Sequence, residues 1–366
     1  MKTNIKRAIG LGAFCSALLI SCDKGGGSFS LIPDGDSFQQ NSSSSVNNKI
    51  DILFVVDNSG SMSPAQTNLT NNFHSFITNF VTKGYDFQIA ITTTDAYLAG
   101  DNFYKKGASA YPNYTSTQMR ALANFKGPVL TPSTSSIESK FVSNATVGDR
   151  GDGDERALSS FRESLNRNPT FHRPDAFLAV IILSDEDDFS DPIRPEASWT
   201  KSGGVADHSY SDPNLETVDS YVNYLDTLTG STVTTKNYNV SAIATLDTAC
   251  KNQENQSYAE SIIGQRYMDL ATKTNGVLGS ICDTSFADSL TLIETKILEL
   301  STQFYLSRLP DPATIVIHVN GATVPEDATN GWTYQSTSNS IVFHGSAIPP
   351  QGAVINVDFQ PKSAQN

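Results

Sequence analysis

Residues 50–61 read IDILFVVDNSGS. The segment 50–56 is a nearly continuous apolar run rich in branched side chains, which is typical of a strand buried on both faces of a parallel sheet. The polar residues that follow lie where this strand would end, and ligands bind at the carboxyl ends of strands in open α/β sheets. Asp57, Ser59 and Ser61 offer one carboxylate and two hydroxyls, which are hard oxygen donors that suit Mg²⁺. We therefore expect a divalent cation at the end of this strand.

Strands and helices alternate along the chain as far as residue 306. A second apolar run at 177–183 predicts another buried strand, and apolar residues at helical spacing predict the helices between the strands. Alternation of this kind implies a doubly wound α/β fold, with a mostly parallel sheet and helices on both faces. The expected strands are 50–56, 87–94, 177–183, 238–245 and 276–281, and the expected helices are 64–81, 155–166, 214–228, 258–274 and 286–306.

The pattern changes after residues 310–312, which read PDP. Apolar residues alternate at 315–319, an Asn320-Gly321 turn follows, and further short apolar runs lie at 341–343 and 354–359. These features predict short antiparallel strands. We therefore expect an α/β domain at 49–308 and a small all-β module at 309–366.

The spacing Asp57-x-Ser59-x-Ser61 after a buried strand resembles the metal-ion-dependent adhesion site (MIDAS) of von Willebrand factor type A domains. The resemblance implies a second aspartate at the end of the family's fourth strand, and Asp185 stands at the end of the apolar run that begins at Phe177. The resemblance also implies a divalent cation, with Mg²⁺ expected first and Mn²⁺ or Ca²⁺ as alternatives. The acidic residues that follow, 186–188, are expected to form an exposed loop.

The third loop of this site departs from the family's pattern. The family has a threonine before its third helix, but residues 146–155 read TVGDRGDGDE and have no threonine at the helix entrance. Counting back from the helix, Asp152 occupies the corresponding position, with Thr146 and Asp154 as alternatives. An acidic ligand here would favour Mn²⁺ or Ca²⁺.

The resemblance implies a site that leaves one coordination position for a carboxylate of a partner. The expected partner is a protein or a glycoconjugate. Two long insertions, 95–128 and 186–213, follow the ends of predicted strands and would overhang the site. Their aromatic residues either form a recognition surface or hold their own loops in place. The residues that we consider for this role are Tyr97, Phe103, Tyr104, Tyr111 and Tyr114 in the first insertion and Trp199, His208 and Tyr210 in the second.

The N-terminus has the pattern of a secretory signal. A basic start is followed by an apolar stretch that ends at Leu19-Ile20-Ser21-Cys22, which resembles the lipobox of bacterial lipoproteins. We expect a signal peptide at 1–21, a lipid on Cys22 and a flexible tether at 22–48. The expected location is the periplasmic or cell-surface side of the inner or outer membrane. Segments at 266–271 and 279–283 resemble a lipoprotein subgroup of the same domains, in which a β tail tends to follow.

Two of the four cysteines remain after processing and lipidation, because Cys15 leaves with the signal and Cys22 carries the lipid. An exported compartment is oxidising, which favours a disulfide between Cys250 and Cys282. Two separate buried thiols are the alternative. In the lipoprotein subgroup the two cysteines would join the last strand to the preceding one.

Composition excludes several classes of function. The chain has 366 residues, 38 acidic and 25 basic side chains, and a formal charge of -13, so nucleic acid is not an expected partner. The histidines are scattered, and no Gly-x-Ser-x-Gly motif occurs, so we do not expect an enzyme. A haloacid-dehalogenase-like phosphotransferase would need a carboxylate where Ser59 stands. The remaining alternative is an envelope scaffold whose metal site is non-functional or purely structural.

Overall fold

The computed structural model describes residues 49–106, 108, 110–193, 200–202, 205–207, 213–256 and 261–362. For 200–202 and 205–207 only the backbone is described. The predicted signal peptide, Cys22, the tether, and Trp199, His208 and Tyr210 lie outside the described residues or side chains.

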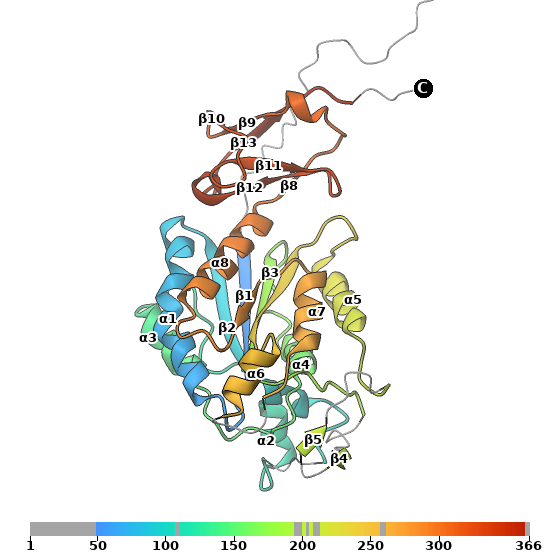
Figure 1. The fold of residues 1–366 in the computed structure, drawn as a ribbon. Helices are drawn as coiled ribbons and strands as arrows, with labels where there is room; N and C mark the ends of the chain where they lie inside the picture. Colours follow the sequence, from blue (N-terminus) through green and yellow to red (C-terminus); the bar gives the residue numbers. More distant parts are fainter. Residues whose placement is uncertain are drawn as a thin grey trace, which may run out of the picture. The chain divides into compact units, whose positions relative to one another are not determined.

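A five-stranded parallel sheet forms the centre of the domain, as the apolar runs predict (Figure 1). Strand β1 pairs with β2 on one side and β3 on the other, and β6 and β7 extend the sheet beyond β3. The order β2-β1-β3-β6-β7 confirms the doubly wound α/β class. The bounds are β1 Lys49–Val56, β2 Asp86–Thr93, β3 Phe177–Ser184, β6 Tyr238–Ala244 and β7 Leu278–Ser280.

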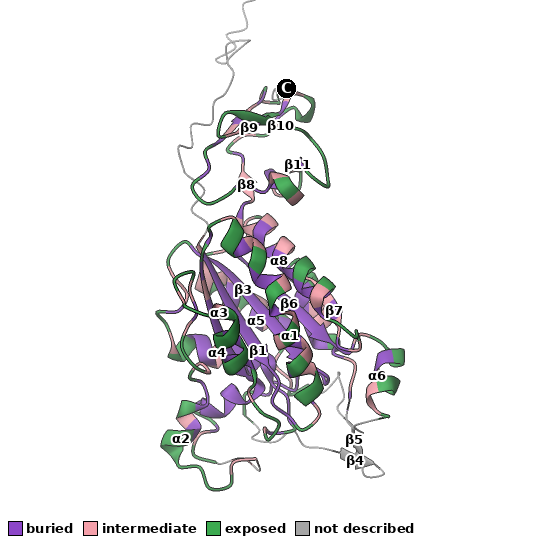
Figure 2. Ribbon diagram, turned by 90° about the vertical axis from the view of Figure 1, so that its left-hand side faces the viewer, coloured by how far each residue is buried: buried purple, intermediate pink, exposed green. Residues whose placement is uncertain are grey.

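Helices cover both faces of this sheet, and the strands between them are almost entirely buried (Figure 2). Alternate residues of β1 face opposite clusters, because side chains of a strand point to its two faces in turn. Phe54 packs with α1, α3 and α8, whereas Leu53 and Val55 pack with α4, α5 and α7. The bounds are α1 Ser63–Thr82, α3 Ile137–Ala145, α4 Ala157–Arg167, α5 Val218–Thr229, α7 Gln265–Lys273 and α8 Ala287–Ser301.

Several elements differ from the prediction. The helix expected at 258–274 begins only at Gln265, after Gly264, and an unpredicted helix α6 (Thr248–Glu254) precedes it. The insertion at 95–128 holds a 3-10 helix, η1 (Thr94–Ala99), and helix α2 (Ser116–Ala121). A short antiparallel pair, β4 (Thr200–Ser202) and β5 (Val205–Asp207), lies in the second insertion.

The C-terminal strands form two antiparallel three-stranded sheets, β10-β9-β13 and β11-β12-β8, which confirms the small β module. Asn320 and Gly321 both have positive φ, as a tight hairpin turn requires. Strand β8 belongs to this pairing, so antiparallel structure begins before the predicted boundary at 309. The bounds are β8 Phe304–Tyr305, η2 Pro312–Thr314, β9 Val316–Val319, β10 Ala322–Val324, β11 Trp332–Gln335, β12 Ser340–Phe343, η3 Gly345–Ala347 and β13 Ile355–Asp358.

None of the helices in the described part of the chain combines the length and the apolarity needed to cross a bilayer.

The predicted disulfide between Cys250 and Cys282 is present, with the two Cα atoms 5.7 Å apart. Cys250 lies in α6 rather than in a strand, and Cys282 follows β7. The bridge therefore joins the end of the last parallel strand to the helix that follows β6.

Replacing both cysteines by alanine is expected to lower the free energy of unfolding by about 3 to 4 kcal/mol, because the bridge closes a loop with a sequence separation of 32 residues. Urea unfolding of the oxidised protein and of the double variant measures this difference. Reducing agent should destabilise the wild type and leave the double variant unchanged. Equal stability of the two proteins under oxidising conditions would contradict the prediction.

Glu294 is expected to make the free energy of unfolding depend on pH. Its side chain is fully buried between α8 and α1, where Oε1 accepts from Asn79 N at 2.8 Å and Oε2 accepts from Asn79 Nδ2 at 2.6 Å. Burial raises the pKa of Glu294 to about 7 in spite of these hydrogen bonds. Between about pH 4.5 and 7 the folded chain therefore binds more protons at this residue than the unfolded chain, so the contribution of Glu294 to stability falls as pH rises.

Glu294→Gln is expected to remove this part of the pH dependence. The decline in the free energy of unfolding from pH 5 to pH 8 should become smaller by about 2 to 3 kcal/mol. Denaturant titrations at several pH values measure the decline. Glu138→Gln is the matched control, because Glu138 is half exposed beside His74. An unchanged decline in Glu294→Gln would refute the assignment.

Candidate metal centre

Asp57 lies at the end of β1, fully buried, with both carboxylate oxygens oriented by hydrogen bonds. Its Oδ1 accepts from Ser59 N at 2.8 Å, and its Oδ2 accepts from Ser184 Oγ at 2.7 Å. The backbone N of Asp57 donates to Leu183 O at 2.9 Å, which continues the pairing with β3. Both oxygens accept hydrogen bonds, and because a carboxylate has about four lone-pair sites, it retains capacity for a cation.

The two serines of the first loop lie side by side. Ser59 Oγ is 3.3 Å from Ser61 Oγ, and Ser59 is buried while Ser61 is partly exposed. Neighbouring ligands of one Mg²⁺ lie about 3 Å apart, because the ion takes octahedral ligands at 2.0–2.1 Å. The hydroxyls therefore match the spacing of two ligands of a single cation.

Asp185 follows β3 at the same edge of the sheet and is buried. Its backbone O accepts from Ile262 N, Thr245 Oγ1 and Ser261 Oγ, each at 3.0 Å, which fixes the turn at this position. Burial, and then the charge of Asp185, raise the pKa of Asp57 to about 7. Two carboxylates in a buried site repel each other, and a divalent cation between them would remove that repulsion. The residues present thus fit a hard divalent cation.

The third loop packs directly on the first. Gly151 N donates to Asn58 O at 2.6 Å, and a Cβ at Gly151 would lie 2.4 Å from Asn58 Nδ2, so only glycine fits. Gln66 of α1 joins the same loops, because its Nε2 donates to Asp57 O at 2.9 Å and to Gly148 O at 2.7 Å. Loop residues 148–152 are therefore held beside the Asp57 turn.

The three candidates in the third loop have different surroundings. Asp154 accepts from the guanidinium of Arg156, and Thr146 Oγ1 donates to Val142 O at 2.8 Å at the end of α3. Asp152 is buried and follows Gly151 directly, so it stays our proposed ligand. Among the described residues, no three His, Cys, Asp or Glu side chains gather closely enough to bind a metal by themselves. The carboxylates of Asp57, Asp152 and Asp185 therefore do not form such a group in this structure, and the proposed set depends on its serine hydroxyls.

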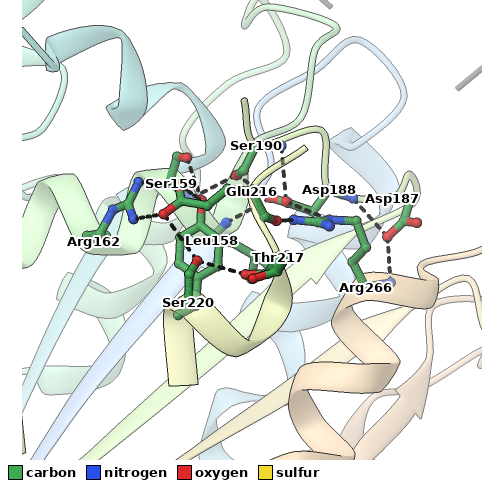
Figure 3. A network of polar contacts seen from close by, with 11 residues as sticks. Leu158, Ser159, Arg162, Asp187, Asp188, Ser190, Glu216, Thr217, Ser220 and Arg266 are labelled. Atoms are coloured by element: carbon green, nitrogen blue, oxygen red, sulfur yellow. Dashed lines mark hydrogen bonds and ion pairs between the residues drawn. The ribbon is translucent and has the colours of Figure 1, made fainter. Parts of the chain in front are cut away.

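The prediction that residues 186–188 form an exposed acidic loop is wrong. Glu186, Asp187 and Asp188 are all buried. Asp188 accepts from Leu158 N at 2.9 Å and Asp187 accepts from Arg266 N at 2.9 Å, so the two carboxylates cap the first turns of α4 and α7 (Figure 3).

An arginine from α7 neutralises part of this buried charge. Arg266 Nε donates to Asp188 Oδ2 at 3.1 Å, and its Nη2 donates to Glu216 O at 2.5 Å (Figure 3). Arg266 and the start of α7 lie far from residues 186–188 in the sequence, so the acidic sequence 186–188 by itself suggested an exposed loop. Asp187 and Asp188 can be buried because they cap helices, and because Asp188 also pairs with Arg266.

Sequence reasoning also missed Glu155. This residue is fully buried at the entrance of α4, and burial together with the charges of Glu186 and Asp57 raises its pKa well above the usual range. Its position directly before an apolar helix start was the only signal in the sequence. Glu155 adds a carboxyl group behind the proposed site.

A cavity of about 230 Å³ opens beside the site. The start of α1, the end of α6 and the segment that contains the disulfide line it. Its walls include Ser61, Met62, Asp185, Glu254, Ile281 and Asp283. A partner group bound at the metal would have this cavity next to it.

The aromatic residues of the first insertion mostly hold the insertion together. Tyr97 and Phe103 are buried with their ring centroids 5.3 Å apart, and the Arg120 guanidinium lies 3.5 Å from the Tyr104 ring centroid. Tyr114 is 44% exposed, and it is the one exposed residue among the six aromatic residues of this insertion.

Comparisons with known proteins add little beyond the fold. The sequence matches no protein-family model and no curated protein sequence. The pilus adhesin SpaC from Lactobacillus rhamnosus GG, in its open conformation, is a structural neighbour at 13% identity and a TM-score of 0.40, over 85% of this chain and 38% of that chain. The ArnB paralog VWA2 from Sulfolobus acidocaldarius aligns at 10% identity and a TM-score of 0.30, over 86% of this chain and 57% of that chain.

Proximal thread matrix protein 1 from the mussel byssus is a further neighbour, at 12% identity and a TM-score of 0.36, over 72% of this chain and 50% of that chain. The chain thus covers 38% to 57% of the length of these three structures. Similarities this distant carry no argument about function. The α/β assignment rests on the sheet and helices themselves.

Proposed function

We propose that this chain is a lipid-anchored protein of the von Willebrand factor type A kind that binds a protein or glycoconjugate partner through a divalent cation. The observation that carries the proposal is the position of Asp57 and Asp185 after the neighbouring parallel strands β1 and β3, at the carboxyl edge of the sheet, with the hydroxyls of Ser59 and Ser61 in the same loop as Asp57. Asp152 is the proposed ligand from the third loop. Mg²⁺ fits this donor set best, with Mn²⁺ and Ca²⁺ as alternatives.

Each residue has a defined task in this proposal. Ser184 and the backbone of Ser59 hold the Asp57 carboxylate in place, and a cation bound between the buried Asp57 and Asp185 would offset the cost of burying two acidic groups together. The bound cation would supply an electrophilic position for a partner carboxylate. The adjoining cavity would receive the partner residue next to that carboxylate. The proposed activity is binding, without a catalytic step.

The anchor belongs to the same proposal. Lipidation at Cys22 would tether the domain to a membrane through the segment 22–48, on the periplasmic or cell-surface side. The second candidate is an envelope scaffold whose metal site is non-functional or purely structural. Asp152, an acidic residue where the family has a hydroxyl, favours that candidate, because an additional carboxylate can complete the coordination without a partner.

Water-proton relaxation with Mn²⁺ separates the two candidates. A site with an open position exchanges water rapidly, so the relaxivity of Mn²⁺ should rise on addition of the protein and fall again when acetate occupies that position. A closed structural site would bind Mn²⁺ with little enhancement and no response to acetate. Absence of Mn²⁺ binding, checked by calorimetry with Mg²⁺ and Ca²⁺ as well, would overturn the cation-dependent binding role and favour a scaffold with a non-functional site.

A further inference from the structure

Asp95 is a fully buried carboxylate at the start of the first insertion, directly after β2. It lies outside the proposed ligand set, and sequence reasoning did not single it out. Three different segments donate hydrogen bonds to it. Its position at the carboxyl end of β2 places it at the same edge of the sheet as Asp57 and Asp185.

Two of these donors belong to the loops of the metal site. Asn58 Nδ2 in the first loop donates to Asp95 Oδ2 at 2.8 Å. Asp152 N in the third loop lies 3.2 Å from Oδ1 and 3.3 Å from Oδ2 of the same carboxylate. Asp95 therefore bridges the residue after Asp57 and the backbone of the proposed third-loop ligand.

The third donor comes from the insertion itself. Tyr111 Oη donates to Asp95 Oδ2 in a short hydrogen bond, and Asn58 Nδ2 also lies 3.3 Å from Tyr111 Oη. Tyr111 is partly buried, and its ring contacts that of Tyr114 in a tilted arrangement, with the centroids 4.7 Å apart. The insertion thus reaches the metal loops through one phenol and one carboxylate.

We propose that Asp95 and Tyr111 are positioning residues that hold the third loop against the first loop in the arrangement that binds the cation, so that the insertion 95–128 sets the affinity of the metal site. This inference rests on the proposed function. Asp152 can contribute its side chain only where its backbone is held, and the bond from Asp152 N to Asp95 holds it. Tyr111 and Asn58 in turn orient the Asp95 carboxylate toward that N–H.

Tyr111→Phe tests the proposal without changing any charge. The Mg²⁺ dissociation constant, measured by calorimetry, should rise about 5-fold, because a hydrogen bond to an ionised group is lost and the third loop is held less firmly. Asp95→Asn should weaken Mg²⁺ binding further, at least about 10-fold, because one of the two acceptor oxygens is replaced by an NH2 group, which cannot accept a hydrogen bond and would face a donor. Tyr114→Phe is the matched control, since Tyr114 lies in the same insertion and contacts the Tyr111 ring.

Thermal melts of the wild type and of both variants in EDTA distinguish a positioning role from a purely structural role. A purely structural role would lower the melting temperature in EDTA and leave the Mg²⁺ dissociation constant of the folded protein unchanged, which would overturn the proposal. A double-variant cycle adds a second check. In an Asp152→Ala background, Tyr111→Phe should have no further effect on Mg²⁺ affinity, and a full 5-fold effect there would show that Tyr111 does not act through Asp152.

The measurements on the wild type distinguish a failure of the proposed function from a failure of this inference. If the wild type binds none of the three cations, the metal site and this inference fall together. If the wild type binds Mg²⁺ and both Tyr111→Phe and Asp95→Asn bind it equally well, the metal site stands and only the positioning role is refuted.

Discussion

Asp57→Asn is expected to abolish the rise in melting temperature that Mg²⁺ causes in the wild-type protein. A ligand that binds only the folded state stabilises it by about 2.7 kcal/mol at 100 times its dissociation constant, which for a protein of this size corresponds to a rise of about 3 to 5 °C. Asparagine keeps the size of the side chain but removes the charge. The variant should therefore show the same melting temperature in Mg²⁺ and in EDTA.

The same variant makes a second prediction about the protein without metal. Burial and Asp185 both oppose ionisation of Asp57, so removing the charge should leave the melting temperature in EDTA equal to or above that of the wild type. Differential scanning fluorimetry over a series of Mg²⁺, Mn²⁺ and Ca²⁺ concentrations measures both effects. Asp149→Asn is the control, because Asp149 is an exposed acidic residue of the third loop. A cation-dependent rise that persists in Asp57→Asn would place the metal elsewhere.

Arg156→Met is expected to lower the free energy of unfolding by about 3 to 5 kcal/mol, the effect of breaking a buried ion pair on one side. Arg156 is fully buried, and its Nε and Nη2 donate to Asp154 Oδ2 at 3.0 and 2.5 Å. Its Nη1 donates to Asp191 O at 3.0 Å, and its guanidinium lies 4.6 Å from the Tyr97 ring centroid. Methionine fills much of the space but removes the charge that neutralises Asp154.

A control and a compensating change test the cause of this effect. Arg167→Met, at the other end of α4, should cost less than about 1 kcal/mol, because Arg167 is 30% exposed and its partners are reached by solvent. Adding Asp154→Leu to Arg156→Met should recover part of the loss, since the buried negative charge is then removed as well. Urea unfolding gives all four free energies. A loss below about 1 kcal/mol in Arg156→Met would show that the ion pair is not needed for stability.

The sequence alone predicted the parallel sheet, the helices α1, α4 and α5, the β module and the disulfide. These features follow from local patterns: continuous apolar runs at 50–56 and 177–183, helical spacing of apolar side chains, an Asn-Gly turn, and a cysteine count. It also predicted Asp57, Ser59, Ser61 and Asp185 as ligands, and the structure places them at one edge of the sheet. That they bind a metal stays a prediction.

Only the tertiary structure decided which acidic residues are buried and what they contact. Asp187 and Asp188 cap helices that begin at Gln265 and Ala157, and Asp95 receives hydrogen bonds from Asn58, Tyr111 and Asp152. The sequence contains each of these residues, but a carboxylate next to other carboxylates looks the same in a solvated loop and in a capping network. Apolar periodicity can be recognised within a single segment of the sequence. The partner of a buried carboxylate lies in a distant segment, so the role of that carboxylate can be recognised only when the folded structure shows the two side by side.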